Sequence, residues 1–391
     1  MTRASPPVVI IGGAIVGSSI AFFLRELGHA GPITVLERDP TYQRSSTALS
    51  AAAIRAQFGC PVNVRMSLFG AEFFRTIKDR FGPDADIGFV ERGYLILGGP
   101  GTVPARRAGV AMQRDAGADA VALMPEEARA RFPWLNTDGL GIATTTRRDE
   151  GWFDAWSLLS LIRRAARERG VTYAHAEAAS IVVGGSGRIT GVTLADGGTV
   201  EAEWCIDAAG PSAASIVRDL GIDLPVSPRK RTVFSIRAPL ARDGFPMLFD
   251  TSGAWIRPEG EGFICGIGPS AGEEDPDATG DFEPSHDLLD AVWPALAHRI
   301  PALEQLRVDR AWAGHYEVNT LDHNAIIGPH HEVANLVFAT GFSGHGAMHA
   351  PATGRGVAEL ITKGRFESID LSPLGFERVR AGTPLHETVI Y

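Results

Sequence analysis

The feature that most constrains the fold is a short unit between residues 8 and 37. Val8–Ile11 is a continuous β-branched run, as expected of a strand that is buried on both faces. A cluster of glycines follows, and apolar residues then recur at helical spacing as far as Gly28, a typical helix terminator. Ile33–Leu36 predicts a second strand, which ends at Glu37. The unit is therefore βαβ, which implies a parallel sheet.

The glycines of this unit have nearly the spacing of a dinucleotide-binding turn. Gly12 suits the tight turn after the strand, and Gly17 suits close packing of the helix on the strand. Ala14 stands where a further glycine usually lets the backbone approach a pyrophosphate, although Gly13 beside it relieves crowding. The spacing alone is weak evidence, but a strand before it and a helix after it strengthen the prediction of dinucleotide binding.

The flanking residues favour a particular orientation of such a cofactor. Ile15 and Val16 would open the helix, whose free N–H groups and partial positive charge attract a pyrophosphate. Glu37 can accept a hydrogen bond from a ribose hydroxyl and would repel a 2′-phosphate, so NADP is disfavoured.

Glycine-bearing strand ends recur far along the chain, and they favour FAD over NAD. A Ser/Arg loop, Arg44–Thr47, directly follows the second strand, whereas a nicotinamide dehydrogenase usually continues βαβαβ. Ala208–Gly210 and Gly341–Gly346 repeat the pattern of strand, glycine and helix. A cofactor held by three distant parts of one chain must be long and buried. An NAD-dependent dehydrogenase remains an alternative, and it would be colourless when purified.

The rest of the chain alternates between two kinds of pattern. Strand–helix alternation appears three times, and two β-rich stretches interrupt it. We therefore predict an α/β fold, with a Rossmann-like FAD-binding domain built from discontinuous segments and an inserted, antiparallel-β-rich α+β substrate domain. The FAD-binding domain would comprise residues 1–85, 150–222 and 320–391, and the substrate domain residues 86–149 and 223–319.

Several local elements can be predicted within these domains. Asp154 is a suitable N-cap for a helix, and Met66–Phe81 has helical spacing. Glycine turns at residues 184–187 and 196–198 separate three strands of a β-meander, whose last strand should run into Cys205–Gly210.

Composition excludes several classes of function. The net charge is −9, and the densest basic run, Pro228–Arg231, is short enough to be a solvated loop, so nucleic-acid binding is not expected. The uncharged stretch Val8–Leu24 is interrupted by glycines, so no membrane span is expected. Cys60, Cys205 and Cys265 show no metal-ligand spacing, which predicts no metal site and a reduced, cytoplasmic chain.

Taken together, these motifs resemble the FAD-dependent amino-acid and secondary-amine oxidoreductases, such as sarcosine oxidase, glycine oxidase, D-amino-acid oxidase and dimethylglycine dehydrogenase. The segments that carry the resemblance span the chain: Val8–Gly17 with Glu37 and Arg38, Ser45 to Arg55, Asp207–Pro211, Asp322 with Ile326–Gly328, and Ala339–Gly346. Three further stretches resemble the branch of FAD-oxidoreductase-domain proteins linked to assembly of respiratory complex I: Ser46–Gln57, Phe342–Pro351 and Gly364–Pro373.

The resemblance implies a set of cofactor-binding residues. Those for the ADP half are Gly12, Gly13, Ala14, Ile15, Val16, Gly17, Glu37 and Arg38, with Ala178 at the adenine. Those for the pyrophosphate and the flavin are Ser45, Ser46, Thr47, Ala209, Gly210, Gly341, Gly344, His345, Gly346 and Met348. The backbone of residues 344–346 is expected along the pyrimidine edge of the flavin.

The chain departs from the sarcosine oxidase pattern at four places. His315 replaces the cysteine that forms a flavin thioether, so FAD is expected to be non-covalent. Met348 replaces a lysine that helps to hold the substrate carboxylate, and Gly262–Gly268 lacks the lysine that activates oxygen. Ala52 stands where one of two active-site arginines is found, which leaves Arg55.

Four residues are the candidates for catalysis. Arg55 is the first choice to bind a substrate carboxylate, because guanidinium binds carboxylate bidentately, although a structural role is the alternative. Arg257 is a second choice, with a core ion pair as its alternative. Trp255 would form a wall of the pocket, with an ordinary core tryptophan as the alternative. His345 would be a polar contact or proton carrier, with a structural hydrogen-bond partner as the alternative.

The predicted reaction is oxidation of a small-molecule amine or amino acid. A hydride would pass to flavin N5, and the resulting imine would hydrolyse. The electron acceptor would be O2 or another carrier. A flavoprotein scaffold or assembly factor with little turnover is the alternative from a different class.

Overall fold

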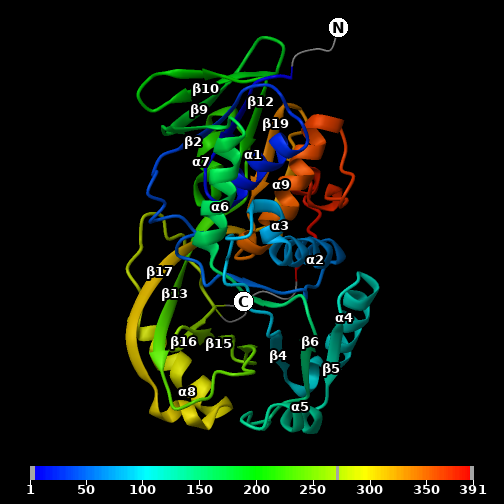
Figure 1. Ribbon diagram of the computed structural model, residues 1–391, viewed down its shortest axis with the longest axis vertical. Helices are drawn as coiled ribbons and strands as arrows, with labels where there is room; N and C mark the ends of the chain where they lie inside the picture. The colour runs from blue at the N-terminus through cyan, green and yellow to red at the C-terminus, as the bar shows by residue number, and fades with distance from the viewer. Residues whose placement is uncertain (1–4, 270–272, 388–391) are drawn as a thin grey trace.

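The computed structural model describes residues 5–269 and 273–387, and it stacks two sheet-based halves along its long axis (Figure 1). The upper half in that view carries a six-stranded sheet and the lower half an eight-stranded sheet. The predicted combination of a Rossmann-like domain and a β-rich domain is confirmed.

The six-stranded sheet contains the predicted βαβ unit. Its strands, in spatial order, are β18 (Ile326–Pro329), β19 (Leu336–Thr340), β12 (Trp204–Asp207), β1 (Val8–Ile11), β2 (Ile33–Glu37) and β8 (Thr172–His175). Every neighbouring pair is parallel except β18 with β19. The sheet is buried on both faces, which explains its continuous apolar strands.

Different layers cover the two faces of this sheet. On one face lie α1 (Ile15–Glu26), α6 (Ala155–Glu168) and α9 (Gly346–Lys363). On the other lie α7 (Ala213–Val217) and a three-stranded sheet of β9 (Ala178–Val183), β10 (Ile189–Leu194) and β11 (Thr199–Glu201). Successive residues of β1 point to opposite faces of the sheet, because Ile10 packs with the helices and Val9 packs with the three-stranded sheet.

The eight-stranded sheet is formed by segments that are far apart in the chain. Its strands, in spatial order, are β17 (Arg307–Asn319), β13 (Val226–Arg237), β16 (Gly262–Ile267), β15 (Ala254–Glu259), β14 (Met247–Phe249), β4 (Tyr94–Gly98), β6 (Ile142–Thr146) and β5 (Ala120–Leu123). Only β14 with β4 is a parallel pair. A second core lies between this sheet and α5 (Pro125–Arg131) and α8 (Leu289–Arg299).

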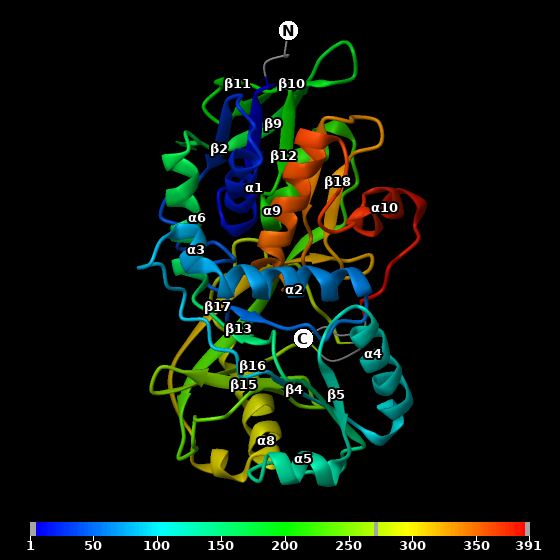
Figure 2. The same cartoon turned by 45° about the vertical axis from the view of Figure 1, so that its right-hand side comes forward.

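The remaining elements lie at the junction and the edges. Helix α2 (Pro61–Arg75) crosses the junction of the two halves in Figure 2, followed by α3 (Ile77–Phe81). A two-stranded ribbon joins β3 (Ala53–Ile54) and β7 (Gly151–Trp152), while α4 (Val103–Asp115) and α10 (Glu377–Ala381) lie at the edges.

Long strands connect the halves directly. β13 and β17 pair antiparallel along their whole length, from Val226 opposite Asn319 to Arg237 opposite Arg307. Val318 of β17 also forms a bridge with Phe342, just beyond the end of β19. The upper ends of these strands therefore lie beside the carboxyl end of the six-stranded sheet.

Three local predictions need correction. The helix predicted at Met66–Phe81 begins earlier, at Pro61, where proline suits the first helical position, and it is broken at Thr76. The third strand of the meander is two strands, β11 and β12, and only β12 enters the six-stranded sheet.

The third correction concerns the basic run, which is a strand and not a solvated loop. It lies in β13, and a segment of acidic residues that runs alongside it neutralises its charges. Arg231 donates to both oxygens of Asp275 at 2.8 Å, and Lys230 donates to Asp281 at 2.7 Å.

The predicted helix cap is confirmed. Asp154 caps α6, and its Oδ1 accepts from the N–H groups of Trp156 and Ser157. None of the helices in the described ranges combines the length and hydropathy that a bilayer crossing demands. In the same part of the chain, His, Cys, Asp and Glu side chains form no group of three that could hold a metal ion.

Candidate functional site

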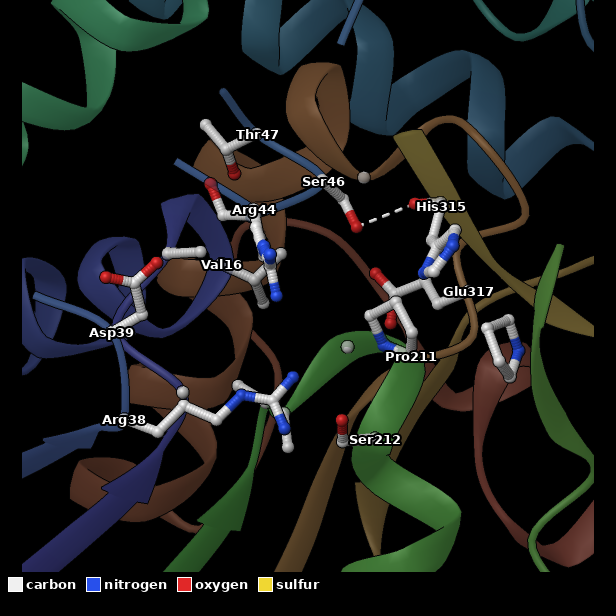
Figure 3. A pocket seen from close by; sticks show the side chains of 18 of the residues that line it. Val16, Arg38, Asp39, Arg44, Ser46, Thr47, Pro211, Ser212, His315 and Glu317 are labelled. Carbon is white, nitrogen blue, oxygen red and sulfur yellow. Dashed lines mark hydrogen bonds between the residues drawn. The ribbon is translucent and has the colours of Figure 1, made fainter. Parts of the chain in front are cut away.

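A large cavity lies at the carboxyl end of the six-stranded sheet, where the two halves meet. Its volume is about 760 Å³, and parts of β1, β2 and β17, the residues just after β12 and the first turns of α1 and α9 line it (Figure 3). Ligands of open α/β sheets bind beyond the carboxyl ends of the strands, so its position matches that expected for a cofactor.

The turn after β1 is shaped by crowding that only glycine tolerates. Gly12 has φ +96°, and a Cβ placed on it would lie 2.3 Å from the carbonyl oxygen of Ala208. A Cβ on Gly17 would lie 1.9 Å from the carbonyl oxygen of Gly12. The two glycines therefore allow α1 to start directly against the sheet, with its N-terminus at the cavity.

The acidic residue at the end of β2 is held in place by the same turn. Glu37 accepts hydrogen bonds from the N–H of Gly13 and from the N–H of Asp39, both at 2.9 Å. The carboxylate lines the cavity and keeps lone pairs with which to accept from a ligand hydroxyl. Arg38, also in the lining, is exposed and lies 3.8 Å from Glu177.

The Ser/Arg loop joins the two halves around the cavity. Ser46 donates to the carbonyl oxygen of His315 at 2.7 Å, which ties the loop to β17 (Figure 3). Thr47 accepts from the N–H of Ile15 at 3.3 Å, so one N–H of the α1 terminus already has a partner. Ser45 accepts from the N–H of Ala48 at 3.1 Å.

The glycine loop after β19 forms the opposite end of the cavity. Gly344 has φ +101°, and a Cβ on it would lie 2.4 Å from the ring of Tyr316. Helix α9 then begins at Gly346, and its first residues, Gly346 and Ala347, line the cavity. The positive end of this 18-residue helix therefore points at the cavity.

The structure brings together most of the predicted cofactor-binding residues. Fourteen of them line the cavity: Gly12, Ala14, Ile15, Val16, Glu37, Arg38, Ser45, Ser46, Thr47, Ala178, Ala209, Gly210, Gly344 and Gly346. Five do not line it: Gly13, Gly17, Gly341, His345 and Met348. Two of these five lie directly behind the lining. The N–H of Gly13 donates to the carboxylate of Glu37, and the N–H of Gly341 donates to the carboxylate of Glu317, so they orient two lining side chains.

His345 faces away from the cavity. Its N–H donates to the carbonyl oxygen of Phe342 at 3.1 Å, and its ring packs against Phe58 and His349. Burial, with the nearby charge of Arg55 as a smaller cause, lowers the pKa of His345 to about 3. The imidazole is therefore neutral at physiological pH.

Arg55 is buried behind the cavity and does not line it. Its guanidinium donates to the carbonyl oxygen of Gln57 at 2.6 Å and lies 3.9 Å from the ring centroid of Phe58. Tyr316 lines the cavity, and burial raises the pKa of its hydroxyl. The positive charge of Arg55 is close enough to Tyr316 to lower that pKa in part. Its charge therefore acts on the inner end of the cavity.

The remaining two catalytic candidates differ in their surroundings. Arg257 is buried, donates to the carbonyl oxygen of Ala51 at 3.1 Å and pairs with Glu259, so it ties the sheet to the Ser/Arg loop. Trp255 lines a second cavity of about 30 Å³. The two cavities adjoin, since both are lined by Ser46, Ser50, His315 and Tyr316.

Sequence reasoning missed two carboxyl groups beside the cavity, the half-buried Glu317 and the buried Asp207. Glu317 of β17 lines it, and burial raises the pKa of Glu317 to about 7, although donors from Thr340 and Gly341 oppose the shift. Asp207 lies behind Ala209, and burial raises the pKa of Asp207 to about 8. The available signal was an acid inside an otherwise aromatic and apolar strand segment, residues 315–318.

The lining fits a long dinucleotide. The cavity extends from the turn at Gly12, past the carboxylate of Glu37, to the N-terminus of α9, so two helix N-termini face it. All three cysteines are buried away from the lining, which excludes a thioether to a ligand here.

Comparisons with known proteins agree with this geometry. The family model described as FAD dependent oxidoreductase matches residues 7–360. FAD-dependent oxidoreductase domain-containing protein 1 of Xenopus laevis is 40% identical, over 97% of this chain and 84% of that protein. Glycine oxidase of Geobacillus kaustophilus is 26% identical, over 95% of this chain and 96% of that protein. The solved structure of L-proline dehydrogenase from P. horikoshii superposes with a TM-score of 0.85 and 28% identity, over 97% and 99% of the two chains.

Proposed function

The chain belongs to the FAD-dependent oxidoreductase family, so FAD is its cofactor, and we propose that it oxidises a small amino acid or N-substituted amine. The chemistry that FAD supplies when bound is acceptance of a hydride, at N5, from the carbon beside the amine nitrogen. The relatives named glycine oxidase and L-proline dehydrogenase support this class of substrate.

One observation carries the proposal. The large cavity ends against Tyr316 of the eight-stranded sheet, and the small cavity beside Trp255 opens from the same place. A volume of about 30 Å³ accommodates only a few non-hydrogen atoms, since one ordered water needs about 10–15 Å³. We therefore propose that the substrate is small and lies between the cofactor cavity and this sheet.

We propose that Arg55 supplies the charge that holds a substrate carboxylate near Tyr316. The guanidinium is buried, so its attraction for a carboxylate is screened less than that of a surface arginine. Fixing the carboxylate positions the C–H bond, and such positioning can supply much of the acceleration. The neutral ring of His345 adds no competing positive charge. The imine product then hydrolyses in water.

We propose that different segments of the chain bind the cofactor and the substrate. We assign residues 1–85, 150–222 and 320–391 to the cofactor and residues 86–149 and 223–319 to the substrate. Because β16 carries no lysine, we propose an electron carrier as acceptor, with O2 as the alternative. The three free, buried cysteines support a reducing, cytoplasmic location.

The experiment is anaerobic bleaching of the purified flavoprotein. Glycine, sarcosine, dimethylglycine and L-proline are each added at millimolar concentration, beside methylamine and pyrrolidine as matched amines without a carboxylate. We expect one carboxylate-bearing compound to bleach the flavin within minutes and its carboxylate-free match to act far more slowly. Rapid recolouring in air would identify O2 as the acceptor, and slow recolouring would identify a carrier.

A scaffold or assembly factor is the competing proposal. It is favoured by one observation, that the relative at 40% identity is named for its FAD-dependent domain and not for a substrate. A protein that retains FAD and is reduced by dithionite, but that no compound in the panel bleaches, would support the scaffold and contradict the oxidoreductase proposal.

A further inference from the structure

The carboxyl group of Glu317 lies in the cavity lining, between the end of β19 and the start of α9. Its Oε2 accepts from the hydroxyl of Thr340 at 2.7 Å and from the N–H of Gly341 at 3.0 Å. Its Oε1 faces the start of α9, because a Cβ placed on Gly346 would lie 3.5 Å from it. The side chain also lines the cavity, so it faces the space that the cofactor would fill.

At this position, the carboxylate of Glu317 and a reduced flavin would be two neighbouring negative charges. The N-terminus of α9 provides about half a positive charge, which can stabilise one anion. An oxidised flavin that gains two electrons and one proton carries a net charge of −1. If the carboxyl of Glu317 stayed ionised beside it, two like charges would share one helix terminus in a cavity with little water, which is unfavourable.

The neighbouring charges do not relieve this conflict. Asp207, at the end of β12, is a second acid, and burial together with the charge of Glu317 raises the pKa of Asp207 to about 8, so it brings no positive charge. On β13, Arg229 and Arg231 lie near Asp275 and Lys230 pairs with Asp281, so their charges are compensated.

The charge of Arg55 acts on Tyr316 and His345, whereas the pKa of Glu317 is set by burial and by its donors Thr340 and Gly341. His315 lies two residues earlier on β17, and its Nε2 hydrogen bonds to the carbonyl oxygen of Asp281. The loop between β19 and α9 contributes only the ring of His345, whose low pKa keeps it neutral. Protonation of the carboxylate is therefore the simplest way to remove the negative charge of Glu317.

We propose that Glu317 takes up a proton from solvent when the FAD in this cavity is reduced, so that this side chain couples the reduction equilibrium of the flavin to pH. The electrons come from whichever reductant is used, and the proton that joins the carboxylate is additional to the one that the flavin itself gains. The proposal rests on the family's cofactor and not on the substrate proposed above. Burial that raises the pKa of Glu317 to about 7 supports it, because the group then titrates near neutral pH.

The test is a redox titration of the purified holoenzyme against indicator dyes between pH 5.5 and 9. Three proteins are compared: the wild type, Glu317→Gln as a neutral isostere, and Glu304→Gln as a control that removes an exposed carboxylate outside the cavity lining. We expect the wild type and E317Q to agree near pH 5.5, where Glu317 is protonated in both redox states. At pH 9 the reduced form should be favoured at least tenfold more in E317Q, which is about 30 mV for two electrons.

The outcomes separate coupling from a structural role. E304Q should follow the wild type at every pH. A constant offset between E317Q and the wild type across the pH range would overturn the proposal, since it shows that no proton is exchanged. The dyes need no amine substrate, so failure of the substrate proposal and failure of this one are distinguishable.

A second variant keeps the proposal testable where E317Q does not retain FAD. Thr340→Val removes the hydroxyl that donates to Oε2 but leaves the carboxyl in place. Losing a donor to the ionised form raises the pKa of a carboxyl group. The bend in the plot of potential against pH should therefore move to higher pH, and an unmoved bend would contradict the assignment to Glu317.

Discussion

The two walls of the cavity are built in different ways. On the side of the six-stranded sheet, backbone atoms make the close contacts, and glycines at positions 12 and 17 are required because neighbouring carbonyl oxygens leave no room for a Cβ. On the side of the eight-stranded sheet, side chains form the wall, with Tyr316, Glu317 and Trp255 facing the two cavities. The shape of the first wall therefore depends on backbone geometry, and the properties of the second depend on which side chains are present.

This difference shows why one wall suits a cofactor and the other a substrate. Backbone N–H groups and helix termini recognise a pyrophosphate whatever the surrounding side chains are, so relatives with different substrates can keep the same turn. A substrate site needs particular polar groups and a particular shape, and these change with each side chain. Variants on the two walls should therefore fail in different ways.

The largest effect is expected from Gly12→Ala on the backbone wall. The added Cβ would meet Ala208 at 2.3 Å, and φ +96° is itself strained for alanine, so we expect a loss of at least about 3 kcal/mol. FAD content, read from the ratio of flavin to protein absorbance, should fall to near zero, and the thermal midpoint should drop. Gly185→Ala is the matched control, because nothing lies within 4 Å of its Cβ and the change should stay within about 0.5 kcal/mol. Normal FAD content in G12A would show that the turn is not held by crowding.

A smaller effect is expected from Arg55→Met on the side of the substrate. Loss of a charge-assisted contact should lower kcat/KM for the carboxylate-bearing substrate about 100-fold, with FAD content unchanged. Arg55→Lys should recover part of this loss, since it keeps the charge but not the planar fork. Arg237→Met, at an exposed surface pair with Asp309, serves as control. Equal losses for a substrate and its carboxylate-free match would mean that Arg55 is structural.

The smallest effect is expected from Asp207→Asn, which is buried behind the backbone wall. Because burial raises the pKa of Asp207 to about 8, the folded wild type holds a proton that the unfolded chain releases above its ordinary pKa. Wild-type stability should therefore fall as pH rises from about 4 to 8. The difference in thermal midpoint between D207N and the wild type should grow over that range and then level off. A difference that does not vary with pH would show that Asp207 stays ionised.

The backbone wall is the part of the site that could be predicted from the sequence. Gly12, Gly17 and Glu37 are separated by one helix and one turn, so local spacing alone indicates how they come together. The cap at Asp154 is equally local. These elements are confirmed because the physics that determines them acts over a few residues.

The side-chain wall could not be predicted, because long-range strand pairing creates it. Trp255 and Tyr316 meet only because β13, β15, β16 and β17 align in one sheet, and no local spacing encodes that register. The basic run was misassigned for the same reason, since the acids that neutralise it come from residues 275 and 281. Glu317 was overlooked because an isolated acid in a strand has no motif.

The paired strands β13 and β17 have a mechanical consequence. They pair from Arg237 opposite Arg307 at one end to Val226 opposite Asn319 at the other, with one register shift between Ser235 and Ile236, and they reach the edge of the cavity. Separation of the two halves would therefore have to break or bend these backbone hydrogen bonds. We expect the cavity to open instead through short loops such as residues 44–50, which line it in part.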